Sequence, residues 1–458
     1  MGILFLILFV ISEVVLVVLT FTKFSEKVKW LRNRAIVTGV EFILLLGVIL
    51  LPTTYMKWRF FCALIVLFIR LAIAGISWLV KRKKAVGTKK KVGRIVSCVL
   101  SVVIMTVSLI LTFVFANYNG LETTGEFEIM ESNAILIDQS RKEEFESDGS
   151  FREVPVHFYY PDSNGEFPLV VFSHGAFGYY QSNYSTYSEL ASHGYVVAAL
   201  DHSYHAFFTE DTDGNIVIVD NKFITDAMEF SNGNKSEEEA FIISQEWMKL
   251  RTEDESFVLD TIKSAKDSGK LSDSWYTEND DEIFSVISKT DTDKIGLIGH
   301  SMGGATAVAL GRERSDIDAV IDLDGTMLGE IISVKDGKYE YIREPYPVPL
   351  LDFRKESDYN KMEQLKNERD FADSYVFGFA YANDYVVKNA ENSRTVIFQN
   401  VGHMDFTDLP LFSPFLSSML GKGEVKSEEF LLMMNGVILN WFDYYLKDEG
   451  TLDIQAKY

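Results

Sequence analysis

The chain has 458 residues and a net charge of -22, which is divided unevenly between two parts. Residues 1–118 contain sixteen Lys and Arg residues and only three acidic ones, a net charge of +13, which leaves -35 for the remainder. This length and the charge break near Tyr118 predict two domains, 1–118 and 119–458. The acidic second domain excludes nucleic acid as its partner, because phosphate binding requires basic patches.

Four apolar segments in the first domain are each close to the roughly 20 residues that a helix needs to cross a bilayer. They are residues 2–22, 35–51, 60–80 and 95–117. Four such segments within 118 residues leave no polar face for the buried helices of a soluble core. The first segment also lacks the basic start and small-residue exit of a cleaved signal peptide. We therefore predict four transmembrane helices and a multi-pass protein of the cell membrane.

Basic residues in the connections predict the orientation of these helices. Loops 23–34 and 81–94 are rich in Lys and Arg, and they lie on the same side if all four segments span. The positive-inside rule makes that side cytoplasmic, so the second domain is expected to be extracytoplasmic. Three charges, Glu13, Glu41 and Arg70, fall within the spans, and pairing of the arginine with a glutamate would fix how the helices pack.

The second domain follows a linker at 119–125 and alternates short apolar segments with helical ones. This pattern is typical of an α/β fold with a mostly parallel central sheet flanked by helices. The expected strands are Val154–Tyr160, Leu169–Ser173, Tyr195–Leu200, Lys294–Ile298, Ala319–Leu323, Val348–Phe353 and Thr395–Gln399. The expected helices are Tyr184–Ser192, Glu238–Ala265, Ala305–Arg312, Lys355–Lys366 and Glu428–Tyr445.

Residues 203–292 are too many for a plain crossover between two strands. We interpret them as an insertion that carries a crossover helix and a candidate cap near the active site. The acidic run 237–239 within it is interpreted as a solvated surface. Both cysteines, Cys62 and Cys98, lie in the first domain, so the second has no disulfide, cysteine nucleophile or thiolate metal site. We expect neither a metal ion nor a cofactor.

A nucleophile elbow is the clearest motif of the second domain. Gly299-His300-Ser301-Met302-Gly303 has the form G-x-S-x-G, and it follows an apolar strand and precedes a helix start rich in small residues. The turn is so tight that side chains at the two glycine positions would clash with neighbouring backbone. Ser301 is therefore predicted to be the nucleophile, with its hydroxyl above the sheet.

A serine nucleophile needs a base and an acid that orients the base. Only one histidine, His403, follows Ser301, and it lies just beyond the last expected strand, where the base of an α/β-hydrolase should lie. Asp322 and Asp324 share one face of their strand, so alternation does not separate them as candidate acids. Asp324 is favoured because it lies beyond the strand, while Asp405 is interpreted as a local turn partner.

The oxyanion hole needs two backbone N–H donors. One is expected from Met302, the residue after the nucleophile. The other is expected from the loop His174–Gly178 that follows an early strand, with Ala176 as the preferred donor and Phe177 as the alternative. His174 and Gly175 could instead form a simple turn.

Several stretches carry a resemblance to a known family: Val170–Gly175, Leu190–His202, Gln245–Arg251, Ile298–Thr306, Ile321–Gly325 and His403–Asp408. Together they resemble the platelet-activating factor acetylhydrolase family, the plasma and type II branch of the lipase-like α/β-hydrolases. The likeness covers about Val154 to Asp408 and none of the membrane part.

This resemblance implies the α/β-hydrolase fold, with Ser301 as nucleophile, Asp324 as acid, His403 as base and Ala176 as oxyanion donor. It also implies a metal-independent esterase that acts on phospholipids with short or oxidised acyl chains. The residues after Gly175 and after Asp324 depart from the family pattern, which leaves the acyl-chain preference open.

The sequence thus predicts a serine carboxylic-ester hydrolase that acts through an acyl-enzyme on a lipid or small ester. One alternative is an esterase or peptidase of the same fold that acts on the cell envelope. Another is a membrane transporter or sensor whose outer domain only binds ligand, although a binding module has no need of all three triad residues.

Overall fold

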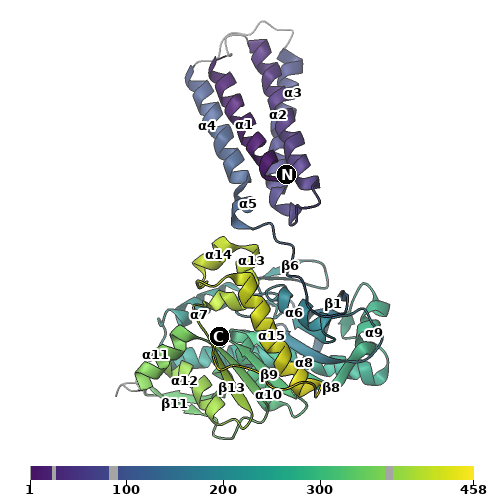
Figure 1. Cartoon of the computed structure of the whole chain (residues 1–458), viewed down its shortest axis with the longest axis vertical. Helices are drawn as coiled ribbons and strands as arrows, with labels where there is room; N and C mark the ends of the chain where they lie inside the picture. Colours follow the sequence, from purple (N-terminus) through teal and green to yellow (C-terminus); the bar gives the residue numbers. More distant parts are fainter. Residues whose placement is uncertain (1, 23–26, 82–90, 367–374) are drawn as a thin grey trace. The chain divides into compact units, whose positions relative to one another are not determined.

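The computed structural model describes residues 2–22, 27–81, 91–366 and 375–458. The basic residues of 23–26 and 82–90, which contribute to the expected orientation, lie outside this described part. The chain divides into two compact units: Met1–Asn119 with Leu411–Leu416, and Gly120–Pro410 with Ser417–Tyr458. The first consists mainly of apolar helices and the second contains the sheet (Figure 1).

The helices of the first unit are α1 (Gly2–Thr22), α2 (Lys27–Leu50), α3 (Phe61–Lys81), α4 (Lys91–Ser108) and α5 (Ile110–Val114). Within the described residues, two stretches are long and apolar enough to cross a membrane, Val28–Leu50 and Lys57–Val80. Two further apolar helical stretches, Ile7–Phe21 and Val99–Ser108, are shorter. The structure therefore shows two candidate spans where the sequence predicts four.

Two of the predicted helices differ in their limits. The helix expected over 95–117 is broken at Leu109 into α4 and α5. Helix α2 begins at Lys27, well before the apolar segment 35–51, because Lys and Arg favour helix and extend it beyond its apolar part.

An ion cluster joins three of the apolar helices. The Arg70 guanidinium on α3 lies against the Glu13 carboxylate on α1, and it also lies 3.7 Å from the Glu41 carboxylate on α2. Glu41 is fully buried. Because a buried carboxylate without a counter-charge is costly, this cluster favours one arrangement of α1, α2 and α3.

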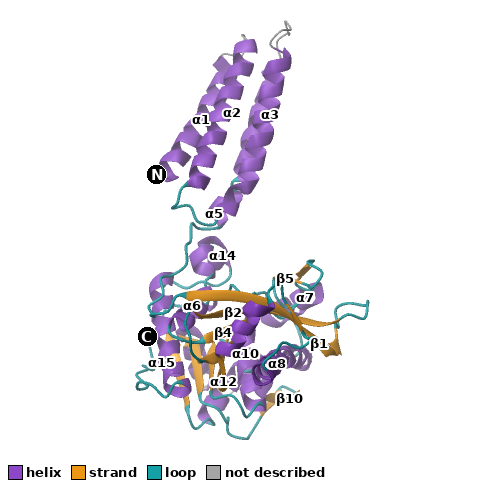
Figure 2. Cartoon of the chain, turned by 90° about the vertical axis from the view of Figure 1, so that its right-hand side faces the viewer, coloured by secondary structure: helices purple, strands orange, loops and turns teal. Residues whose placement is uncertain are grey.

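The second unit is built on a nine-stranded sheet of order β13-β12-β9-β8-β3-β4-β2-β1-β7 (Figure 2). The strands from β13 to β4 are mutually parallel, and β2, β1 and β7 continue the sheet in antiparallel pairings. The bounds are β1 Ile129–Lys142, β2 Phe151–Pro161, β3 Phe167–Ser173, β4 Val196–Leu200, β7 Trp275–Tyr276, β8 Thr290–His300, β9 Ala319–Leu323, β12 Leu350–Lys355 and β13 Ser393–Phe398. This mostly parallel sheet confirms the α/β class of this unit.

Helices cover both faces of the sheet, which explains why its central strands are apolar without alternation. Leu297 on β8 packs into the core shared with α8 (Glu237–Ser268) and α10 (Met302–Glu313). The adjacent Gly296 faces α15 (Ser427–Leu446), and on the same side Phe172 of β3 contacts Tyr187 of α6 (Tyr184–Ser192). Figure 2 shows α15 and α8 on opposite sides of the strands.

The segment 203–292 contains a hairpin and three helices. The hairpin pairs β5 (Phe208–Glu210) with β6 (Ile216–Ile218), and the helices are α7 (Asn221–Ser231), α8 and α9 (Asp280–Lys289). Helix α8 begins at a capping box formed by Ser236 and Glu239 and ends at Gly269, whose φ is 67°. The acidic run 237–239 is the first turn of α8, where negative charge favours the helix N-terminus.

The remaining elements lie between β9 and β12, between β12 and β13, and after β13 in the chain, and part of α13 and α14 belongs to the first unit. A second hairpin pairs β10 (Ile331–Lys335) with β11 (Lys338–Tyr341). The remaining helices are α11 (Glu356–Lys366), α12 (Tyr375–Lys388), α13 (Leu409–Phe412) and α14 (Pro414–Met419).

The contact between β8 and α15 generates a prediction about stability. A Cβ atom at Gly296 would lie 2.6 Å from a ring carbon of Phe442 and 3.0 Å from a methyl carbon of Leu446. We expect Gly296→Val to lower the free energy of unfolding by about 1–3 kcal/mol, because the core is overpacked there. Thermal unfolding of the full chain in detergent measures this as a lower Tm.

The matched control is Gly436→Ala on the same helix α15, where a Cβ atom meets nothing within 4 Å. This variant should be more stable than the wild type by about 0.5–1 kcal/mol, because alanine favours a helix interior over glycine. Equal Tm values for Gly296→Val and the wild type would show that α15 does not pack closely enough against β8 at Gly296 to exclude a larger side chain.

Candidate active site

Ser301 lies at a sharp turn between β8 and α10. Its φ is 56° and its ψ is -119°, a conformation that residues with a side chain rarely adopt. The turn requires glycine on both sides. A Cβ atom at Gly299 would lie 2.3 Å from the carbonyl carbon of Gly303, and one at Gly303 would lie 1.9 Å from the carbonyl oxygen of Ser173. The G-x-S-x-G sequence is therefore required by the close approach of three backbone segments.

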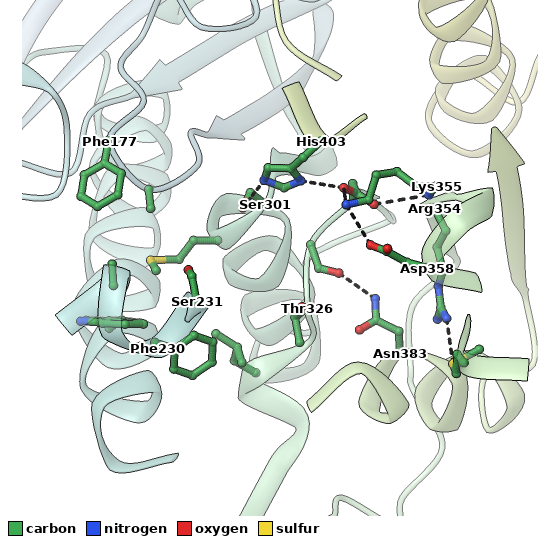
Figure 3. A pocket seen from close by; sticks show the side chains of 18 of the residues that line it. Phe177, Phe230, Ser231, Ser301, Thr326, Arg354, Lys355, Asp358, Asn383 and His403 are labelled. Carbon is green, nitrogen blue, oxygen red and sulfur yellow. Dashed lines mark hydrogen bonds and ion pairs between the residues drawn. The ribbon is translucent and has the colours of Figure 1, made fainter. Parts of the chain in front are cut away.

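The structure places Ser301, His403 and Asp324 in one hydrogen-bonded chain (Figure 3). His403 begins a short 3-10 helix, His403–Phe406, that follows β13. Its Nε2 lies 3.0 Å from Ser301 Oγ, and its Nδ1 lies 2.6 Å from Asp324 Oδ2. Because an ionised carboxylate only accepts hydrogen bonds, Nδ1 carries the proton, and Nε2 is left to accept from the serine hydroxyl.

The two candidate acids are separated by the backbone after β9. Asp324 has a φ of 55°, and this left-handed residue turns its carboxylate to His403. Asp322 is fully buried, and its Oδ1 accepts a hydrogen bond of 2.8 Å from Gly325 N. The Asp405 carboxylate accepts from backbone N–H groups in its own turn region, at 2.8 Å from Gly402. Of the three aspartates, Asp324 is the one that contacts the histidine.

The electrostatics of Asp322 and Asp324 also differ. Burial and the nearby Asp352 carboxylate raise the pKa of Asp322 well above its usual value. Burial acts in the same direction on Asp324, but the hydrogen bond to His403 and the charges of His403 and Lys355 outweigh it and lower the pKa of Asp324. Asp324 is therefore held as a carboxylate beside the imidazole.

The loop His174–Gly178 passes directly beside the nucleophile. A Cβ atom at Gly175 would lie 2.9 Å from His300 Nδ1 and 3.2 Å from Ser301 Cβ. The Phe177 N–H donates to the carbonyl oxygen of His205 at 3.1 Å, so it is already engaged. Ala176 and Phe177 both line the cavity that contains Ser301 and Met302, so the bond of Phe177 N–H to His205 is the observation that favours Ala176 as the expected donor.

A buried arginine contacts the backbone of the loop His174–Gly178. Arg251 on α8 is completely buried; it donates from Nη1 to the His174 carbonyl oxygen at 2.6 Å and from Nε to His205 Nδ1 at 3.3 Å. Burial and the charge of Arg251 lower the pKa of His205 well below its usual value, so its imidazole is neutral and accepts this bond. The loop next to Ser301 is thus held on both sides of Gly175.

A second buried cluster supports the same loop through His202. Arg152 Nη2 and Nε lie 2.7 and 3.1 Å from the two oxygens of Asp254, and Asp254 Oδ2 lies 3.0 Å from His202 Nδ1. Burial lowers the pKa of His202 to about 3, so the neutral ring donates to Asp254 through Nδ1. Its Nε2 then accepts from the Ser173 hydroxyl at 2.8 Å.

His300, at the variable position of the elbow, contacts the backbone of the candidate base His403. Its Nε2 lies 3.1 Å from the His403 carbonyl oxygen. Burial and the charge of His403 lower the pKa of His300 to about 3, so the neutral ring donates to this oxygen through Nε2. The sequence gives no signal for this role, because the motif accepts many residues at that position.

Ser301, Asp324 and His403 line a cavity of about 310 Å³. One wall is apolar and comes largely from α7 and α8 together with the loop beside the nucleophile: Ala176, Phe177, Ala227, Phe230, Trp247 and Met302. The opposite wall is polar and comes from β12, α11 and α12: Arg354, Lys355, Asp358, Tyr359 and Asn383 (Figure 3). The polar wall is absent from the sequence predictions. No group of three or more His, Cys, Asp or Glu side chains suited to a metal ion occurs among the described residues.

Comparison with known proteins decides the family. Residues 155–453 match the family of platelet-activating factor acetylhydrolase, isoform II. The chain belongs to this family. The platelet-activating factor acetylhydrolase of Bos taurus is 30% identical over 190 residues, 39% of each chain, and that of Canis lupus familiaris is 31% identical over 198 residues, 42% of this chain and 41% of the other. The chain thus spans about two fifths of the length of these curated relatives.

A solved structure shares the α/β-hydrolase fold. The ferulic acid esterase from Streptomyces cinnamoneus superposes with a TM-score of 0.51 at 21% sequence identity, and the superposition covers 74% of this chain and 97% of the esterase. This likeness supports the α/β-hydrolase fold that the sequence predicts.

The buried Arg152–Asp254 pair generates a prediction about stability. Arg152→Met removes the bidentate partner of a fully buried carboxylate, and we expect the free energy of unfolding to fall by about 3–5 kcal/mol. Thermal unfolding of the full chain in detergent is the measurement. The double variant Arg152→Met with Asp254→Leu removes both charges and should recover part of the loss. A single variant as stable as the wild type would contradict a structural role for the pair.

Proposed function

We propose that this chain is a serine carboxylic-ester hydrolase with Ser301 as nucleophile, His403 as base and Asp324 as acid. The observation that carries the proposal is the hydrogen-bonded chain from Asp324 through His403 to Ser301 at the wall of a cavity. Membership of the platelet-activating factor acetylhydrolase family supports it.

The geometry suits acyl transfer in two steps. His403 Nε2 takes the proton of the Ser301 hydroxyl as its oxygen attacks the ester carbonyl, and Asp324 stabilises the imidazolium that forms. The N–H groups of Ala176 and Met302 would hold the negative oxygen of the tetrahedral intermediate. The imidazolium then protonates the leaving alcohol. Water, activated by the same histidine, hydrolyses the acyl-enzyme.

We propose a lipid ester as the substrate class, with the acyl group against the apolar wall of the cavity. This wall is formed by large side chains such as Phe177, Phe230 and Trp247, which suit an acyl chain, while the opposite wall is polar and suits the alcohol part of the ester. The related bovine and canine proteins are both named platelet-activating factor acetylhydrolase, which supports this class.

We also propose that four helices cross the cell membrane and that residues 119–458 lie outside the cytoplasm. The two long apolar helices and the two shorter ones support four spans, and the basic loops support the orientation. A membrane tether would keep the active site near esters that partition into the bilayer. The polar wall and the triad then meet substrate at the outer surface.

The nucleophile assignment predicts that Ser301→Ala abolishes ester hydrolysis. We expect kcat for p-nitrophenyl acetate to fall by about 10⁶-fold, because no other group can form the acyl-enzyme. A fluorophosphonate probe should label the wild type and fail to label the variant. Turnover of the ester by Ser301→Ala at the wild-type rate would overturn the assignment.

A fluorophosphonate probe that cannot cross membranes tests the proposed orientation of residues 119–458. On intact cells it should label the wild-type chain as fully as it does in lysates. Labelling only after lysis would place residues 119–458 in the cytoplasm while leaving the nucleophile assignment intact.

The acid assignment predicts different effects for two neighbouring aspartates. Asp324→Asn should lower kcat by about 10⁴-fold, because an amide in place of the carboxylate favours the wrong histidine tautomer. Asp322→Asn should retain most of the activity, since its carboxylate contacts Gly325 N and not the histidine. Initial rates with p-nitrophenyl acetate distinguish the two. A larger loss for Asp322→Asn would reverse the assignment.

A further inference from the structure

The triad acid has a second charged partner besides the histidine. Lys355 Nζ lies 3.1 Å from Asp324 Oδ2, the same oxygen that His403 Nδ1 contacts at 2.6 Å. Figure 3 shows the Lys355 side chain on the side of the cavity opposite Phe177 and Phe230, and its ammonium group contacts the Asp324 carboxylate. One carboxylate oxygen is therefore shared between an imidazole and an ammonium group.

The position of Lys355 follows from the register of the sheet. It is the last residue of β12, and Leu323 of β9 pairs with Phe353 of β12, so the chain segment that contains Asp324 emerges beside the end of β12. Asp324 N donates to the Phe353 carbonyl oxygen at 3.1 Å, and Lys355 N donates to Asp324 Oδ1 at 3.4 Å. The backbone N–H and the side chain of Lys355, at the end of β12, thus both contact the Asp324 carboxylate.

Lys355 also has a counter-ion that is not part of the triad. Asp358, on the first turn of α11, lies 2.8 Å from Lys355 Nζ through Oδ2. The Asp358 side chain is 64% exposed, whereas that of Lys355 is 17% exposed. The neighbouring Arg354 is directed elsewhere, with Nε 2.6 Å from Asp352 Oδ2.

The physical consequence concerns the charge that the histidine acquires during catalysis. The Asp324 carboxylate stabilises the imidazolium, and a cation on the same oxygen offsets part of that stabilisation. The Asp358 carboxylate, in turn, offsets part of the lysine charge. Two other titratable groups in the described part of the chain lie near His403: His300 from β8 is neutral, and Asp405 on its own turn is bonded to Gly402 N and lies 3.8 Å from Lys422 Nζ.

We propose that Lys355 is a positioning residue that holds Asp324 and sets the lower pH limit of catalysis, with Asp358 moderating its effect. This inference rests on the proposed hydrolysis by Ser301. It gives the polar wall of the cavity a role in the proton transfer, in addition to contact with substrate. The lysine charge, on the same oxygen as His403 Nδ1, opposes formation of the imidazolium, which is the form that cannot accept the serine proton.

The test is the pH dependence of kcat/KM for a neutral aryl acetate, whose binding does not depend on the lysine charge. Lys355→Met keeps most of the side-chain stem and removes the ammonium group. The acidic limb of the profile is the range in which kcat/KM falls as the pH is lowered. In Lys355→Met we expect this limb to move to higher pH by on the order of one unit, because the imidazolium is then better stabilised. Lys355→Arg keeps the charge and should restore the wild-type limb.

Asp358→Asn provides a matched variant at an exposed position, where folding is not at risk. It should move the acidic limb in the opposite direction, to lower pH, because Lys355 then acts more strongly on Asp324. Opposite shifts for the two members of one ion pair are not expected from a purely structural role. Unchanged limbs in both variants, or shifts in the same direction, would overturn the inference.

The proposed function and this inference fail in distinguishable ways. A wild-type chain without Ser301-dependent turnover would remove the proposed function. An active wild type whose acidic limb is unchanged in Lys355→Met and in Asp358→Asn would remove only the role of Lys355.

Discussion

The close approach of α10 to β3 leaves no space for a side chain at Gly303, where a Cβ atom would lie 1.9 Å from the Ser173 carbonyl oxygen. Because the helix begins so close to the sheet, Ser301 must turn through a left-handed conformation to join β8 to α10. The same approach brings the loop after β3 against the nucleophile at Gly175. The conformation of Ser301, the start of α10 and the position of the His174–Gly178 loop are thus consequences of one steric constraint.

This constraint is supported by charges buried behind the loop. Arg251 on α8 bonds to the His174 carbonyl oxygen, and the pair Arg152–Asp254 orients His202 toward Ser173. Buried ion pairs contribute little net stability, but each of these groups has partners that fix its direction. Helix α8 therefore supports the loop beside Ser301 through the buried polar contacts of Arg251 and Asp254.

The sequence predicted the parts of this structure that local rules determine. The central strands are continuous apolar segments, and the elbow is set by glycine, so both could be read directly. The sequence does not predict strand β1. Its buried residues alternate with exposed polar ones, as in an outer strand, so it lacks the continuous apolar segment that marks the central strands. Helix α12 was missed because its Tyr, Phe and Val residues favour strands, and tertiary packing overrides that preference.

The same limit of prediction from local sequence applies to single residues of the candidate site. Alternation could not separate Asp322 from Asp324, because the difference lies in the positive φ of Asp324. Lys355 is predicted to begin a helix, whereas it ends β12, because the charged residues Arg354 and Lys355 end the apolar pattern of the predicted strand Val348–Phe353. Its contact with Asp324 depends on the pairing of β9 with β12, two strands that no short-range pattern relates.

The apolar wall of the cavity comes largely from α7 and α8, between β4 and β8, whereas the triad residues lie at the ends of β8, β9 and β13. Changes in α7 that spare Phe223, which stacks on His205 beside the loop, can therefore alter this wall without contacting Ser301, Asp324 or His403. On the proposed function, exchanging the cavity-lining residues of α7 would change which acyl groups fit against the wall, while hydrolysis of the smallest esters persists.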